Sequence, residues 1–190
     1  CVDFNRWLVE NGYMVLEDGT DTIEDSFHGV DWERTRAYSL GLAGININLK
    51  GREGRGIVAP GDAPALAEEI ARRLETLTTP DGERVIRKAR LGRDEYSGPY
   101  VSDGPDVIPG TAPGFRAGWK CVTGGVGPRV LYPNDMHWNG DHCCDPDLVK
   151  GVLFTGWRIG KKEPAIADIA PTALTVLGVS PPRYMDGSPL

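Results

Sequence analysis

The clearest periodic pattern of apolar positions lies in residues 62–77. Leu66, Ile70, Leu74 and Leu77 recur at spacings of three and four residues, which places them along one stripe of a helix. Acidic and basic residues four positions apart occupy the opposite face, an arrangement that stabilises an exposed helical surface. We therefore predict an amphipathic helix here, with a charged face that is simply solvated.

Alternation with a period of two predicts strands earlier in the chain. Ile45, Ile47 and Leu49 alternate with Asn46 and Asn48, so the apolar side chains would share one face of a strand and the amides the other. A glycine-containing break separates this run from the preceding RTRAYSL segment. The two runs together predict a hairpin-like pair of strands.

Two further helices are predicted near the ends of the chain. The segment FNRWL has apolar residues near helical spacing, and Asn11-Gly12 supplies a stop after it. The segment DIAPTALTVLGV has Asp168 as a helix N-cap, Pro171 in the first turn and Gly178 as the C-terminal stop. Short helices therefore flank the central part of the chain.

The middle of the chain, residues 92–129, is rich in Gly and Pro and has few periodic signals. We expect loops here, either lining a site or inserted into the fold. Residues 151–159, GVLFTGWRI, predict a buried strand. Because strand and helix patterns alternate with loops throughout, the predicted class is α/β, as one domain over residues 1–190 with a helix and loop-rich insertion at about 60–130.

Composition excludes several classes of protein. A chain of 190 residues with 40% apolar residues is long enough to build a core of its own. It has no apolar run of the roughly eighteen residues that a membrane-spanning helix needs. The net charge of -6 and the pI near 5.1 argue against a nucleic-acid partner. Four cysteines without paired C-x-x-C spacing argue against a disulfide scaffold or a structural zinc site, and nothing indicates a cellular location.

Residues 136–147, MHWNGDHCCDPD, concentrate two histidines, two cysteines and three aspartates. Such a segment is typical of a metal site, a redox pair or a polar loop. Adjacent cysteines such as Cys143 and Cys144 rarely form a disulfide, because its geometry strains the peptide between them. We expect small buried side chains or incidental thiols instead. Asp145-Pro146 predicts a turn, with no identified partner for the carboxylate.

Several segments of the chain together resemble a known family. They are, in order, FNRWLVENGYMVL, DWERTRAYSLGLAGININLKGREGRGIV, YSGPY, NGDHCCDP, GVLF and PAIADIAPTALTVLGVSPPRYMDGSPL. Their order resembles the C-terminal part of the type I phosphodiesterase/nucleotide pyrophosphatase branch of the alkaline phosphatase superfamily, over almost the whole chain. The most diagnostic parts are the GDH segment and the tail DIAPTALTVLGV followed by YMDG.

The resemblance implies part of an alkaline-phosphatase-like core, with a mostly parallel sheet flanked by helices. It also implies a hydrolase of phosphate esters or diesters that uses two divalent metal ions, usually zinc, and a Thr or Ser nucleophile. Such an ion pair activates the attacking oxygen and stabilises the leaving oxygen of an in-line displacement. The metals would be bound in the intact protein, whose substrate would be a small phosphate ester.

Only one metal ligand of this chain follows from the resemblance. His142 matches the Gly-x-His position, where the imidazole binds one of the two metals. The nucleophile and the other ligands would lie upstream of Cys1, so no catalytic residue is predicted within the chain. Asp141 is a weaker candidate, as an orienting partner for His142. His28 and His137 are expected to be surface residues.

Two alternatives to the hydrolase remain open. The chain would instead be a noncatalytic module that binds a ligand or partner through residues 92–129, without the active-site half. A third hypothesis is a metal-binding or redox protein built on the DHCCD segment. The chain opens within an amphipathic element and without an initiator methionine, which predicts a piece of a longer protein. We expect this piece to be inactive alone and stable only with its missing N-terminal portion or a partner copy.

Overall fold

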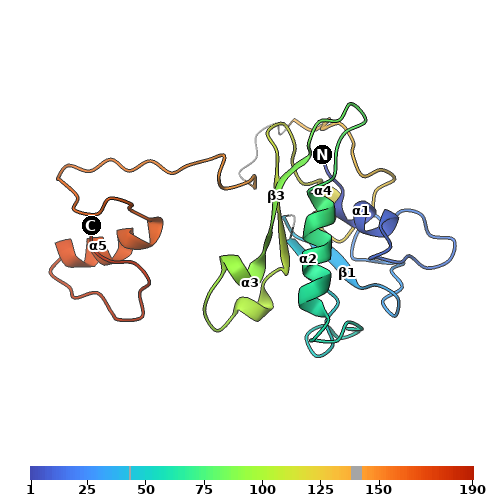
Figure 1. Cartoon of the computed structure of the whole chain (residues 1–190), viewed down its shortest axis with the longest axis horizontal. Helices are drawn as coiled ribbons and strands as arrows, with labels where there is room; N and C mark the ends of the chain where they lie inside the picture. The colour runs from blue at the N-terminus through green and yellow to red at the C-terminus, as the bar shows by residue number, and fades with distance from the viewer. Residues whose placement is uncertain (43, 138–142) are drawn as a thin grey trace. The chain divides into compact units, whose positions relative to one another are not determined.

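The computed structural model describes residues 1–42, 44–137 and 143–190 (Figure 1). The chain divides into two compact units, Cys1–Lys150 and Gly151–Leu190, and each is described by itself. Within the described ranges, no helix is both long enough and apolar enough to cross a membrane.

A four-stranded sheet organises the first unit. In spatial order its strands are β1 (Ala37–Leu40), β2 (Gly44–Ile47), β4 (Val107–Thr111) and β3 (Ile86–Leu91). β1 and β2 pair antiparallel, with Tyr38 opposite Asn46, which confirms the predicted hairpin.

The predicted mostly parallel α/β sheet is wrong, because every pair of these four strands is antiparallel. The link between β1 and β2 is too short for the crossover that parallel strands require. The connection from β3 to β4 contains only the short helices α3 (Gly92–Glu95) and η1 (Val101–Asp103). Alternating strand and helix patterns in the sequence indicate the types of element but not whether neighbouring strands run parallel or antiparallel. The parallel arrangement was taken from the family resemblance, and it was wrong.

Helix α2 (Ala63–Leu74) carries the predicted apolar stripe. Leu66, Ile70 and Leu74 are buried, and the helix packs against β2, β3 and β4. Its first turn contains Pro64, which suits a position where no backbone N–H is needed. The helix ends before the predicted residue 77, so the prediction of its type and apolar face is confirmed and its C-terminal bound is too long.

The charged face of α2 is not simply solvated. Tyr13 donates a hydrogen bond to Glu69 over 2.6 Å, and Arg73 donates to the Tyr13 hydroxyl over 3.1 Å. Glu68 pairs with Arg93, at 2.5 Å between Nη2 and Oε1. These residues therefore attach α2 to other segments of the unit.

Helix α1 (Phe4–Glu10) forms where predicted and buries Phe4 together with three polar residues, Asp3, Asn5 and Arg6. The Asn5 amide donates to the carbonyls of Ser39 and Gly125, over 2.9 and 3.0 Å, and accepts from the Ser39 N–H over 2.7 Å. Asp3 caps the helix by accepting from the Arg6 N–H over 2.8 Å. Buried polar groups thus attach α1 to β1 and to the loop at 125–127.

The segment 92–129 is more regular than predicted. β4 lies inside it and occupies a central position in the sheet, between β2 and β3. Helix α4 (Trp119–Val122) follows, and the intervening backbone forms turns. The strand was missed because VIPGT contains a proline and a glycine, residues that weaken a strand pattern.

The second unit contains η2 (Ile166–Asp168) and α5 (Ile169–Val176). The predicted terminal helix is confirmed, with Asp168 at the N-cap position and Gly178 after the helix at φ +77°. The buried strand predicted for residues 151–159 is wrong, because this part of the chain has no strand and is largely exposed. Apolar residues alone therefore did not predict burial there.

Candidate functional site

The segment MHWNGDHCCDPD is described only at its two ends. Met136 and His137 precede the gap and are exposed, as predicted for His137. The predicted metal ligand His142 and its neighbour Asp141 lie outside the described residues. Within the part of the chain that the structure describes, no three His, Cys, Asp or Glu residues are grouped as metal ligands.

Asp145, three residues beyond His142, is the most strongly held residue of this segment. Its side chain is fully buried and accepts from Arg90 over 3.0 Å and from Arg87 over 3.2 Å. Both arginines also bind Asp147, over 2.9 and 3.0 Å. The prediction of a turn without a carboxylate partner was therefore wrong about the partner: two arginines of β3 bind this segment.

The surroundings of Asp145 favour its charged form. Burial by itself would raise the pKa of Asp145, but hydrogen bonds from Arg90, from the Asp147 N–H and from Arg87 outweigh burial, and the pKa lies below its ordinary value of 3.8. The carboxylate lies directly against Gly110 of β4, where an added Cβ would be 2.8 Å from Asp145 Oδ2. A glycine at that position leaves room for the ion pair. One nitrogen of Arg90, Nη1, is buried and has no hydrogen-bond partner among the described residues.

A cavity of about 640 Å³ lies against both described flanks of the segment. Its wall includes Asn134 on one flank and Cys144 and Leu148 on the other, together with the turn at 112–116. Arg116 of that turn is buried, with its guanidinium 4.7 Å from the ring centroid of Trp119. The two ends of the segment therefore meet around one hollow of the first unit.

The cysteines give no support to a redox pair. None of the four forms a disulfide, and Cys143 and Cys144 are half-buried. Cys121 is buried in the core of the first unit, beside the first residue of α1. Its sulfur accepts a hydrogen bond from the Phe4 N–H over 3.1 Å. Burial, and to a lesser extent the negative charge of Asp3, raises the pKa of Cys121 to about 12, so this thiol stays protonated and unreactive.

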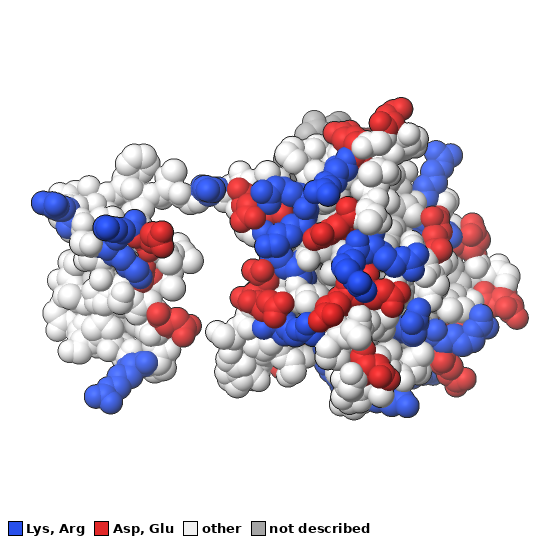
Figure 2. All heavy atoms as spheres, in the orientation of Figure 1, with Lys and Arg blue, Asp and Glu red and all other residues white. Residues whose placement is uncertain are grey.

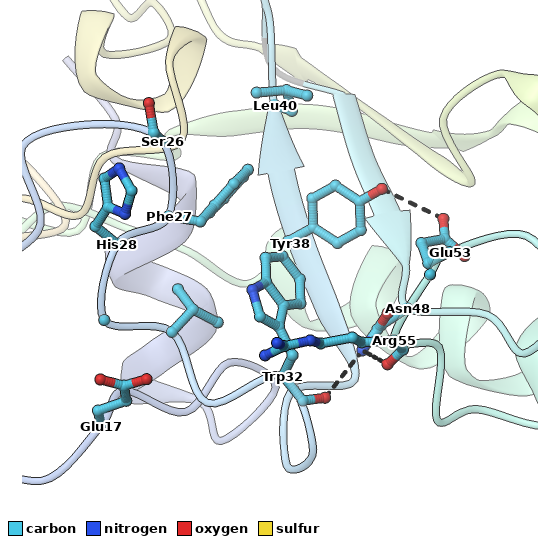
Figure 3. A pocket seen from close by; sticks show the side chains of 13 residues that line it. Glu17, Ser26, Phe27, His28, Trp32, Tyr38, Leu40, Asn48, Glu53 and Arg55 are labelled. Carbon is cyan, nitrogen blue, oxygen red and sulfur yellow. Dashed lines mark hydrogen bonds between the residues drawn. The ribbon is translucent and has the colours of Figure 1, made fainter.

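A second hollow of the first unit, of about 580 Å³, has an aromatic wall (Figure 3). We call it the aromatic pocket. Phe27, Trp32 and Tyr38 contact one another edge to face, with ring centroids 5.3 to 5.6 Å apart. The remaining lining residues are Glu17, Ser26, His28, Gly29, Val30, Leu40, Asn48, Glu53, Gly54 and Arg55.

Strand alternation and one buried amide position the wall of the aromatic pocket. Tyr38 and Leu40 are two apart on β1 and therefore share the face that lines the pocket. Asn48, predicted on the face opposite the apolar residues, lies just beyond the end of β2 and is fully buried. Its amide donates to the carbonyls of Thr35, Arg55 and Trp32, over 2.8, 3.1 and 3.2 Å. The segments bearing Trp32 and Arg55 are thus attached to the end of the same strand.

The other side of the pocket is an unusual turn. Ser26 and Phe27 have φ angles of 55° and 56°, the left-handed region that side chains larger than glycine seldom adopt. Their N–H groups donate to the carbonyls of Thr123 and Gly124, over 2.6 and 3.2 Å. The Phe27 ring occupies the place where a Cβ on Gly124 would lie, 2.7 Å away. The backbone conformation of this turn therefore points the Phe27 ring toward the other rings of the pocket.

The sequence reasoning missed the aromatic pocket. His28 is exposed as predicted, but it lines this pocket together with residues that are separated from it in sequence. The three aromatic residues have no common period, so only the fold brings them together. The sequence places Ser26 and Phe27 in a turn-rich acidic stretch. Its composition does not distinguish this stretch from an ordinary loop. Comparisons of the chain with protein families, with curated proteins and with solved structures give no match.

Proposed function

We propose that this chain is a portion of a metal-dependent phosphoester hydrolase of the phosphodiesterase/nucleotide pyrophosphatase kind. The observation that carries the proposal is the ordered set of segments ending in GDH and the tail DIAPTALTVLGV followed by YMDG. The antiparallel sheet does not support this proposal; the sequence segments and the described residues that flank GDH do.

Those surroundings suit a loop that must hold one imidazole in place. The chain after His142 is fixed by the buried Asp145, which two arginines of β3 bind. Charge-assisted hydrogen bonds of this kind are stronger and more directional than neutral ones. The cavity against Asn134 and Cys144 supplies space beside the same loop. An anchored flank and a neighbouring hollow among the described residues support the proposal that the GDH segment contributes to a metal site.

In the proposed hydrolase, His142 would hold one of two divalent ions, and those ions would supply activation of a nucleophile and stabilisation of the leaving oxygen. The other ligands and the Thr or Ser nucleophile would come from outside this chain. In this proposal the chain supplies the His142 imidazole, and the cavity against Asn134 and Cys144 forms part of the substrate site.

The test uses the chain joined to the longer protein that the proposal requires. With zinc present, we expect hydrolysis of bis-p-nitrophenyl phosphate, and we expect His142→Ala to lower kcat/KM by at least a hundredfold, because one metal loses a ligand. His137→Ala, in the same segment but exposed, serves as the matched control and should retain activity. Unchanged activity and zinc content in His142→Ala would sink the proposal.

A second candidate function, a noncatalytic binding module, has a specific observation in its favour. The aromatic pocket is a formed hollow with an apolar wall and polar groups, the usual composition of a small-molecule site. It is built from residues 17–55 and not from the segment 92–129 that the sequence suggested. A binding module would bind ligand with no metal and no turnover, which separates it from the hydrolase.

A further inference from the structure

We infer that the aromatic pocket is a binding site for a planar aromatic ligand that carries an anionic group. The inference does not depend on the proposed hydrolase activity, since the pocket is separate from the segment containing His142. Three observations carry it: the geometry of the rings, the charges that remain without a partner in the pocket, and the strained turn that holds Phe27.

The rings favour a flat ligand. Phe27, Trp32 and Tyr38 pack edge to face, at interplanar angles of 72° to 85°, so each ring turns its face in a different direction. All three are only partly buried, which leaves ring surface exposed to the hollow. An aromatic ligand can stack on one ring and meet the edge of another, the two arrangements that aromatic pairs prefer. The volume of about 580 Å³ is within the range of small-molecule sites and leaves room for a two-ring ligand.

One of the two carboxylates in the pocket, Glu53, already has partners, although its arginine partner also binds Asp106 over 2.6 Å. Glu53 binds Arg52, at 2.8 Å between Nε and Oε1, and accepts the Leu49 N–H over 2.7 Å. The Tyr38 hydroxyl adds a hydrogen bond to it over 3.3 Å. Burial first, and then the charge of Glu53, raises the pKa of Tyr38 to about 12, so the phenol remains a neutral donor. The oxygens of Glu53 are therefore occupied by the Leu49 N–H, Arg52 and the Tyr38 hydroxyl, and its role is structural.

The groups that remain are mostly donors. Among the residues that the structure describes, the side chains of Arg55, His28 and Ser26 have no hydrogen-bond or ion-pair partner, and neither has the Trp32 indole N–H. Glu17 is the one lining carboxylate of the described residues that is not paired. Figure 3 shows Glu17 and His28 along one side of the pocket and Arg55 and Asn48 along the other. Arg55 carries a permanent positive charge without a partner among the described residues, on the side of the pocket away from Glu17, and it favours an anionic acceptor on the ligand there.

The turn at Ser26 and Phe27 gives an independent reason to assign a function here. Two consecutive non-glycine residues in the left-handed region are energetically unfavourable. Such conformations persist where neighbouring structure enforces them and are concentrated at ligand sites. Here the carbonyls of Thr123 and Gly124 hold the turn, and its effect is to present the Phe27 ring to the pocket.

The test is isothermal titration calorimetry of the full chain with four probes. They are 2-naphthoate, which has the ring and a negative charge, 2-naphthylmethanol, which has the ring alone, 2-naphthylmethylamine, which has the ring and a positive charge, and acetate, which has the negative charge alone. We expect naphthoate to bind about tenfold more tightly than the alcohol, because one charge-assisted hydrogen bond is worth about that factor. Acetate should not bind measurably, because it lacks the ring contacts.

Two variants separate the contribution of the Arg55 charge to binding from the contribution of the Trp32 ring. Arg55→Gln should remove the preference for naphthoate over the alcohol and leave the affinity for the alcohol unchanged. Arg84→Gln, an exposed arginine that does not line the pocket, is the matched control and should behave like the unchanged chain. Trp32→Leu should weaken both aromatic probes, and circular dichroism melting shows whether that variant keeps its fold. Because Arg55 is exposed, its substitution tests the inference even if Trp32→Leu fails to fold.

Several outcomes would overturn the inference. Equal affinity for naphthoate and the alcohol in the unchanged chain would show that the ligand charge is irrelevant. A preference retained by Arg55→Gln would place the anion elsewhere. Tighter binding of 2-naphthylmethylamine than of naphthoate would show that Glu17 dominates the pocket and that it selects cations. Failure of the folded chain to bind either naphthalene at millimolar concentration would remove the aromatic site altogether. None of these outcomes depends on metal or hydrolysis.

Discussion

Asp145 links the segment that contains His142 to an edge strand of the sheet. A carboxylate that is fully buried would be costly by itself, but Arg90 is almost as buried and Arg87 and Asp147 complete the network. Glu95 also contacts Arg90, at 3.5 Å between Oε1 and Nε, so three carboxylates surround the two guanidinium groups. The position of this network, between β3 and the segment, makes it the part of the described structure that most directly controls where that segment lies.

We predict that Asp145→Ala lowers the free energy of unfolding by about 3 kcal/mol, because it leaves the Arg90 charge buried with weaker partners. Asp147→Ala is the matched control, since its side chain is 54% exposed and contacts the same arginines. An exposed pair contributes less than about 1 kcal/mol. Urea unfolding of the two variants measures both values. Equal losses in the two variants would contradict the assignment of the main role to Asp145.

Elements differ in how far the sequence could predict them. The β1–β2 hairpin and helix α2 were predicted because local alternation and a helical stripe determine them. The antiparallel order β1-β2-β4-β3 depends on contacts between distant segments, and the proline and glycine of β4 conceal a central strand. The same limit applies to the sites: a motif singled out His142, whereas the aromatic pocket brings together residues between 17 and 55 that share no local pattern.

At the level of elements, the Asn5 amide attaches α1 to the sheet in addition to the buried apolar side chains Phe4 and Leu8. Asn5 satisfies three buried backbone groups, the N–H and C=O of Ser39 on β1 and the C=O of Gly125. Sequence patterning treats Asn5 as a polar position on an amphipathic helix, although it is completely buried. A buried polar side chain with both ends satisfied specifies the register of the two elements that it joins.

We predict that Asn5→Ala lowers the free energy of unfolding by about 3 kcal/mol, since it leaves several buried backbone groups without partners. Asn46→Ala, on β2 and partly exposed, should change it by less than about 0.5 kcal/mol. Urea denaturation gives both values, and the slope of the transition should stay the same if only the native contacts are lost. A loss below 1 kcal/mol for Asn5→Ala would show that α1 is held by its apolar side chains alone.

At the scale of the whole molecule, the two units are stabilised in different ways. The first has a continuous apolar core that includes Phe4, Leu8, Ile45, Ile70 and Val107. The second is too short for such a core and exposes much of its apolar surface, which appears largely uncharged in Figure 2. Its internal order depends on a polar centre instead. The buried Asp168 carboxylate accepts the N–H groups of Ala165 and Ser188, over 2.8 and 2.9 Å, and both its oxygens bind Lys161.

This polar centre makes the second unit sensitive to acid. The hydrogen bond from Lys161 is the largest cause that lowers the pKa of Asp168 to about 2, from an ordinary 3.8. Because the folded pKa lies below the unfolded one, the stabilisation is complete above pH 3.8 and is lost as the pH falls through about 2. Asp168 therefore supports the fold of this unit throughout the neutral range and well into acid.

We predict that Lys161→Met moves the titration of Asp168 upward, from about 2 toward 3.8, and shifts the acid loss of order in this unit to higher pH. Lys162→Met, its exposed neighbour, is the matched control and should leave the titration in place. Carbon NMR of the Asp168 carboxyl group between pH 5 and pH 1.5 measures the midpoint, and hydrogen exchange of the Ser188 amide reports the order of the unit. An Asp168 that titrates near 3.8 in the unchanged chain would contradict the buried carboxylate. Equal shifts in the two lysine variants would show that general charge, and not the direct Lys161 contact, lowers its pKa.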